Sequence, residues 1–147
     1  MGEVRVKALL VNAADATGAS KQRRAKARSY VADALVDTGA VRTVLPAQVA
    51  RVLGLRTIGR AVAEYADGRR DAVDLVGPLL IEIAQRVTIE DALVLGDEVL
   101  IGQTVLEKLD LQVDSRSRRV CPNPAHPDQP TNKVKRACIS TQRGRHS

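Results

Sequence analysis

The sequence predicts a mainly β domain with one or two short helices. Residues 3–11 alternate charged and apolar side chains, which is the two-residue period of a strand with one buried face. Two further alternating segments, 60–65 and 70–75, flank an Asp-Gly pair that is typical of a hairpin turn. Pro46 and Gly54 bracket a short helix, in the usual order of proline first and glycine last.

Other short segments complete the predicted layout. Residues 30–36 and 41–45 are apolar enough for strands on either side of a turn, and 118–121 is a candidate terminal strand. A second short helix is predicted over 104–109. Tyr30 and Tyr65 are the only aromatic residues, so the core is expected to be aliphatic.

Length and composition favour a single domain that needs no disulfide bonds. A chain of 147 residues is long enough to bury a core without disulfides. Its two cysteines, Cys121 and Cys138, are too few for a disulfide framework or a zinc site. Residues 1–7 are charged and no long apolar stretch follows, so neither a signal peptide nor a membrane span is expected. We therefore expect a cytoplasmic protein.

The net charge of +6 is concentrated near the C-terminus. Residues 1–114 carry 15 basic and 16 acidic side chains, whereas residues 115–147 carry 8 and 1. A smaller basic cluster lies in the predicted loop 12–28. Such clusters bind nucleic acid in some proteins but are more often solvated segments. Because the chain has only two aromatic residues that could stack on bases, nucleic acid is an unlikely partner, and segment 133–147 is the only hint of one.

The chemistry is expected at Asp37, which ends an apolar run. Gly39 tolerates the backbone angles of a tight turn and allows close approach of another backbone. Thr38 adds a hydroxyl that both donates and accepts hydrogen bonds. Taken alone, this pattern also fits a turn in which the aspartate binds its own backbone.

A second apolar-apolar-Gly element, Leu100-Ile101-Gly102, lies downstream and precedes the predicted helix 104–109. With segments 35–40, 43–46 and 105–107, it makes the chain resemble the retropepsin-like aspartic proteases, the retroviral family and its bacterial relatives. The resemblance covers roughly residues 30–120. Apolar segments 79–83 and 92–96 fall where that family has core strands.

This resemblance implies a closed β-barrel or sandwich that is active as a two-fold homodimer. The protease domain would span residues 1–120, followed by a Pro-rich and then basic tail, 121–147, that we expect to be flexible. Segment 118–121 would be the terminal strand that pairs between subunits. Hairpin 60–75 lies where the family has its flap, with Ala66, Asp67 and Gly68 at the tip over the substrate.

The implied activity is that of an aspartic endopeptidase. Only one Asp-Thr-Gly occurs in the chain, whereas the mechanism needs two carboxylates sharing a proton. Asp37 from each of two subunits would therefore form the dyad that activates water, with no cofactor and no metal. Thr38 would bond across the dimer axis, Gly39 would present a carbonyl to the peptide substrate, and Ala40 matches the retroviral residue.

Two positions depart from the retroviral pattern. Val41 and Gln103 stand where retroviral members have an aspartate and an arginine that pair. Because both partners are missing together, no buried charge is left alone. The flap is also more charged than its retroviral counterpart. Dimer contacts and substrate subsites are therefore expected to differ from those of the retroviral enzymes.

Two alternatives to the peptidase stay open at this point. One is a catalytically silent dimer of the same fold that binds peptides or partner proteins, because a fold does not guarantee activity. The other is a nucleic-acid-associated module that uses the basic tail. His126 lies among prolines and is predicted to be an exposed loop histidine without a catalytic or metal-binding role.

Overall fold

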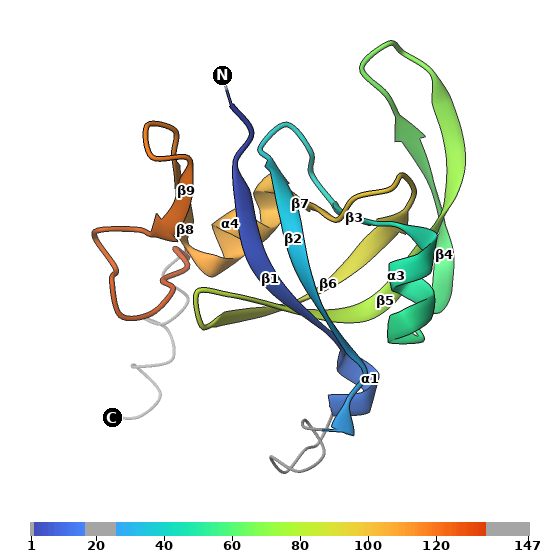
Figure 1. Cartoon of the computed structure of the whole chain (residues 1–147), viewed down its shortest axis with the longest axis horizontal. Coiled ribbons are helices and arrows are strands. Elements are labelled where there is room, and N and C mark those ends of the chain that lie inside the picture. Colours follow the sequence, from blue (N-terminus) through green and yellow to red (C-terminus); the bar gives the residue numbers. More distant parts are fainter. Residues whose placement is uncertain (1, 17–25, 135–147) are drawn as a thin grey trace, which may run out of the picture.

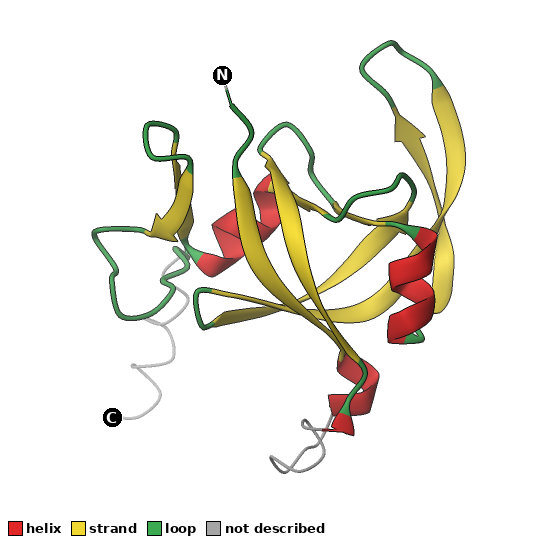
Figure 2. Ribbon diagram, in the orientation of Figure 1, coloured by secondary structure: helices red, strands yellow, loops and turns green. Residues whose placement is uncertain are grey.

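The computed structural model describes residues 2–16 and 26–134 and shows six strands closed into a barrel (Figure 1). Nine strands are described: β1 (Arg5–Asn12), β2 (Ser29–Asp37), β3 (Thr43–Leu45), β4 (Arg56–Glu64), β5 (Arg70–Ile83), β6 (Arg86–Val94), β7 (Leu100–Gly102), β8 (Leu111–Asp114) and β9 (Arg119–Pro122). The helices with described bounds are α1 (Ala13–Ala16), α3 (Ala47–Leu53) and α4 (Gln103–Leu109). The predicted mainly β class, with few and short helices, is confirmed (Figure 2).

The barrel closes because β1 has a hydrogen-bonded neighbour on each side. The strand order is β1-β2-β7-β3-β6-β5, and β1 then pairs with β5. Strand β5 is 14 residues long, and besides β6 it pairs with two other strands, one along each half of its length. Its first half pairs with β4 through Arg70–Gly77, and its second half pairs with β1 through Leu79–Glu82. Strand β4 therefore lies outside the closed ring and forms, with the start of β5, a hairpin that projects from the barrel (Figure 1).

The barrel interior is filled by aliphatic side chains, as the shortage of aromatic residues predicted. Alternate residues of β1 and β2 face inward, so Ala8, Leu10 and Ala34 are fully buried. The largest completely buried side chains include Leu10, Leu45, Leu53, Leu79, Ile81, Ile83, Ile101, Leu106 and Leu109. Since α3 and α4 both contribute leucines to this cluster, each short helix covers part of the barrel.

Helix α3 has the boundaries that the sequence predicted. It follows Pro46, and Gly54 ends it in the left-handed conformation, with φ of 62°. Helix α4 ends at Asp110, which takes the same conformation, with φ of 54°, although it is not a glycine. None of the helices in the described part of the chain is long and apolar enough to cross a membrane.

Helix α1 was not predicted, and a buried asparagine explains it. The Asn12 Oδ1 accepts hydrogen bonds from the backbone N–H groups of Ala14 (2.9 Å) and Asp15 (3.2 Å). Its Nδ2 donates to the carbonyls of Leu53 (2.8 Å) and Gly54 (3.3 Å). One side chain thus caps the start of α1 and the end of α3. Residues 17–25 of the predicted basic loop and 135–147 of the predicted tail lie outside the described residues.

Strands β8 and β9 form a separate two-stranded sheet. Within the chain β9 pairs with β8 in antiparallel register, from Leu111 opposite Pro122 to Asp114 opposite Arg119. The pairing of this terminal strand between subunits stays a prediction. The segment after β9, which the sequence assigned to the tail, is held against the domain by Asn123, because its N–H donates to the Asp110 carbonyl (3.0 Å).

Candidate functional site

Asp37 ends β2, and its side chain is exposed to solvent. The Gly39 N–H donates to Asp37 Oδ1 at 2.9 Å, and the Ala40 N–H donates to the Asp37 carbonyl at 3.1 Å. These two bonds close a tight turn around the carboxylate. A side chain at Gly39 would put its Cβ 3.2 Å from Asp37 Oδ1, so glycine keeps this approach free. Thr38 lies at the exposed tip of the same turn.

The second apolar-apolar-Gly element lies directly beside this turn. Strands β2 and β7 run parallel, with Leu35 opposite Leu100 and Asp37 opposite Gly102. The Gln103 N–H donates to the Ala40 carbonyl at 2.8 Å. A Cβ on Gly102 would lie 2.5 Å from the Ala40 carbonyl oxygen, so only glycine permits this contact. The structure therefore brings the two predicted elements together, although they are far apart in the sequence.

The turn leads into β3, whose first residue is buried. Thr43 is 1% exposed, and its Oγ1 has no hydrogen-bond partner within the described part of the chain. Strand β3 is held between β6 and β7, since Val44 lies opposite both Leu93 and Leu100. The Asp37 loop is thus fixed at its start by β2 and at its end by β3. A carboxylate on a loop that is anchored at both ends by core strands is expected to keep one orientation.

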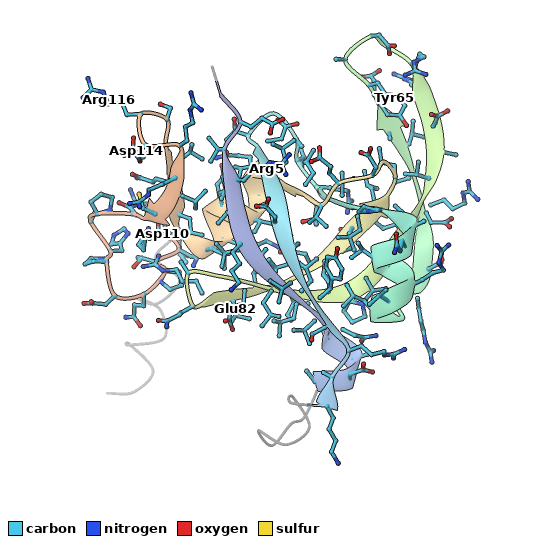
Figure 3. The ribbon with its side chains drawn as sticks, in the orientation of Figure 1. Arg5, Tyr65, Glu82, Asp110, Asp114 and Arg116 are labelled. Carbon is cyan, nitrogen blue, oxygen red and sulfur yellow. The ribbon has the colours of Figure 1, made fainter. Side chains whose placement is uncertain are left out.

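The predicted flap tip lies at the end of the β4–β5 hairpin. The N–H of Tyr65 donates to the carbonyl of Arg69 (2.8 Å), and the N–H of Gly68 donates to the carbonyl of Tyr65 (2.9 Å), which closes the turn over Ala66, Asp67 and Gly68. Asp67 also binds the Arg69 guanidinium at 2.8 Å. No hydrogen bond joins this tip to the Asp37 loop among the described residues. The structure shows the hairpin raised above the barrel (Figure 3), and its closure over a substrate stays a prediction.

An open groove of about 560 Å³ flanks the Asp37 loop. Its apolar lining includes Val41, Ile58 and Ile89, which are 71%, 57% and 50% exposed. The charged residues in the groove are already paired: Arg42 with Asp91, and Lys108 with Glu90 at 2.7 Å. Val41, one of the departures from the retroviral pattern, therefore opens an apolar surface next to the loop. The groove is lined by Val41, Arg42, Ile58, Pro78, Ile89, Glu90, Asp91, Thr104 and Lys108.

Sequence reasoning missed a cluster of polar side chains at the end of α4. Asp110 accepts hydrogen bonds from Asn123 Nδ2 (3.0 Å) and the Thr131 N–H (3.1 Å), and its Oδ2 lies 2.6 Å from His126 Nδ1. These contacts, with the Asn123 bond the largest, hold the pKa of the Asp110 carboxyl below its usual range. The prediction that His126 is exposed is wrong, since its side chain is only 29% exposed and binds Asp110.

A buried arginine completes this cluster. Arg86 is 5% exposed, and its guanidinium donates to the carbonyls of Leu109 (3.0 Å), Asp110 (3.0 Å) and His126 (2.6 Å). The first two carbonyls belong to the C-terminal end of α4, where a cation is favoured. The cluster joins the β5–β6 turn, α4 and the Pro-rich segment. Its sequence signal is weak because the hydrogen bonds of the Asp110 carboxylate and the Arg86 guanidinium join residues 13 to 40 positions apart.

Comparison with models of known protein families and with curated proteins finds no match for this chain. Within residues 2–16 and 26–134, no three His, Cys, Asp or Glu side chains are grouped so that they could hold a metal ion. The site is therefore characterised by its own geometry: one exposed carboxylate on a turn that two parallel strands support.

Proposed function

We propose that the protein is an aspartic endopeptidase that acts as a two-fold homodimer. The observation that carries this proposal is the close contact between the Asp37 turn and Gly102, which fixes an exposed carboxylate at the end of two parallel strands. An exposed carboxylate that accepts one main-chain hydrogen bond, from the Gly39 N–H, is free to bind a water molecule. Nothing in the packing of the barrel requires an acid at this place, because the side chain points into solvent.

Peptide hydrolysis by this site needs a second carboxylate. One carboxylate takes a proton from the attacking water while the other, protonated, polarises the scissile carbonyl. Two-fold symmetry would supply the second group, because any contact between Asp37 loops at the axis brings the same residue from each subunit. Activity should therefore need one protonated and one ionised Asp37 and should fall when both ionise.

The β4–β5 hairpin and the flanking groove suit an extended peptide substrate. Among residues 2–16 and 26–134, strand β4 pairs with β5 alone, so its other edge offers backbone groups to a peptide in extended conformation. The groove adds an apolar surface at Val41, Ile58 and Ile89 beside the loop. Backbone pairing with apolar side-chain contacts is the usual way in which proteases hold peptides.

The proposal is tested by incubating the purified full-length chain with a diverse peptide mixture from acidic to neutral pH. Asp37→Asn removes the acid while preserving the size of the side chain and should abolish cleavage. Asp33→Asn is the matched control, because Asp33 is an exposed carboxylate on the same strand with its side chain 77% exposed. It should cleave as the wild type does.

Two results would count against the proposal. Equal cleavage by the wild type and Asp37→Asn would assign the activity to a contaminant. Absence of cleavage by the wild type, with peptide binding retained, would instead favour the silent peptide-binding dimer.

A further inference from the structure

The β8–β9 hairpin carries three exposed arginines, Arg116, Arg118 and Arg119, and we call it the arginine hairpin. None of their guanidinium groups takes part in an ion pair among the described residues, although ten such pairs involve other side chains there. Arg116 points away from the tip of the hairpin into solvent (Figure 3). Arg119 interacts electrostatically with Asp114, which lies opposite it, but three cations beside one carboxylate still leave a local positive surface on the hairpin.

The acidic groups near this turn are already occupied. Asp114 accepts hydrogen bonds from the backbone N–H groups of Arg116 (3.0 Å) and Ser117 (3.4 Å), so its carboxylate shapes the turn. Glu3, in the N-terminal segment, binds Arg5 at 3.1 Å. Because Asp114 is the one carboxylate that interacts with these three arginines in the described part of the chain, the arginine hairpin keeps positive charge for an external partner.

Arg118 is also held in an unfavourable backbone conformation. Its φ is 54°, a left-handed value that glycine and asparagine tolerate better than arginine. Its guanidinium lies against Gly2, where a Cβ would fall 2.3 Å from Arg118 Cζ. Folding alone would be served better by glycine here, so the arginine needs another explanation.

The arginine hairpin lies close to the Asp37 loop. Gly2 contacts Arg118, and two residues later the carbonyl of Val4 accepts a 2.8 Å hydrogen bond from the N–H of Val36, the neighbour of Asp37. The tip of the arginine hairpin, the loop after β2 and the tip of the β4–β5 hairpin all lie at the same end of the barrel (Figure 1). A polypeptide bound at the Asp37 loop can therefore extend to these arginines.

We propose that Arg116, Arg118 and Arg119 form an exosite that binds an acidic segment of a polypeptide substrate. This inference rests on the proposed function. Arginine matches carboxylates well because its planar fork donates two parallel hydrogen bonds. A nucleic acid is disfavoured because residues 111–122 contain no aromatic side chain on which bases could stack.

The test measures binding of a labelled oligoglutamate peptide by fluorescence anisotropy at low salt, in the Asp37→Asn background so that nothing is cleaved. Arg116→Ser/Arg119→Ser should weaken binding about tenfold, which corresponds to roughly 1.4 kcal/mol, because two exposed ion pairs with the peptide are lost. The matched control, Arg51→Ser/Arg56→Ser, removes the same charge from exposed arginines around α3 and β4 and should leave binding unchanged. The basic segment 135–147 is present in every variant, so its contribution cancels.

A second variant protects the test against a folding defect. Arg118→Gly removes one guanidinium while relieving the positive φ, so its thermal unfolding temperature should not fall while binding weakens. An oligoglutamine peptide of equal length should not bind.

Three results separate the possible explanations. Equal weakening in the hairpin and control variants would overturn the exosite, because net charge alone would then explain binding. Tighter binding of an oligonucleotide of equal charge, lost in the hairpin variant, would assign the surface to nucleic acid. If the acidic peptide binds at the hairpin but the wild type cleaves no peptide, the proposed function fails and the acidic-peptide surface stands.

Discussion

Two aspartates, Asp37 and Asp110, each end a regular element but have opposite surroundings. Asp37 is exposed and accepts one main-chain hydrogen bond, from Gly39. The Asp110 side chain is 14% exposed, and its carboxylate contacts Asn123, His126 and Thr131. A carboxylate held by several hydrogen bonds to the surrounding fold stays ionised and stabilises that fold, whereas an exposed one with a single such bond is open to water. The contrast supports the choice of Asp37 as the reactive group.

The polar contacts of His126 and Arg86 could not be predicted from the local sequence. His126 was expected to be exposed because it lies among prolines, and local sequence predicts only that such a segment lacks regular structure. Its contact with Asp110 spans 16 positions and depends on where the end of α4 lies after folding. The hydrogen bond from Arg86 to the His126 carbonyl spans 40 positions and likewise could not be predicted from local sequence. Buried polar contacts of this kind are set by tertiary packing.

Thr43 provides a prediction at the residue scale. Its hydroxyl is buried without a partner among the described residues, and such a group is costly to keep away from water. Thr43→Val keeps the shape of the side chain and should raise the free energy of unfolding by about 1 kcal/mol in urea titrations. Thr57→Val, at an exposed position, is the control and should change little. A loss of stability in Thr43→Val would show that the hydroxyl has a partner, such as a buried water.

At the scale of elements, the predictions that held were those with a local cause. Helix α3 was predicted from Pro46 and Gly54, and the β4–β5 hairpin from Asp67-Gly68, because each signal acts within its own turn. The start of β6 was missed. The turn before it uses Ala84 and Gln85, with φ of 52° and 65°, and neither residue type predicts a positive φ.

The β2–β7 contact gives a prediction at the element scale. Gly102→Ala would place a Cβ 2.5 Å from the Ala40 carbonyl oxygen, so the Asp37 turn must move away from β7. Such overpacking should cost about 1–3 kcal/mol of stability, and the displaced carboxylate should lower kcat in a peptide cleavage assay. Gly59→Ala is the matched control, because a Cβ there meets nothing within 4 Å. Equal effects of both substitutions on kcat would show that the contact does not position Asp37.

At the scale of the whole molecule, the predicted β class was correct, but the way in which the barrel closes was not predictable from the sequence. Closure depends on β5 changing its partner from β4 to β1 halfway along its length. Gly77-Pro78 stands where the partner changes, but this pair signals only an interruption of the strand. The new partner lies 67 to 73 positions away, and that pairing depends on the assembled core. The resemblance to a protease family singled out both the Asp37 turn and Gly102, but their contact was not predicted, because neither periodicity nor local sequence reports it.

The last prediction concerns the assembled dimer. If each active site needs Asp37 from two subunits, a subunit carrying Asp37→Asn inactivates every dimer that it joins. Wild type and Asp37→Asn mixed in equal amounts, exchanged to equilibrium at constant total concentration, should then retain about one quarter of the wild-type activity, because random pairing leaves that share of intact dimers. Independent monomers would retain about one half under the same rule of mixing. Asp33→Asn, mixed in the same way, should leave activity unchanged, which controls for effects of exchange itself. Dilution of the wild type should lower its specific activity once dimers dissociate. The shared dyad would be excluded if activity per chain stayed constant on dilution and mixing lowered activity only to one half. A single Asp37 would then suffice.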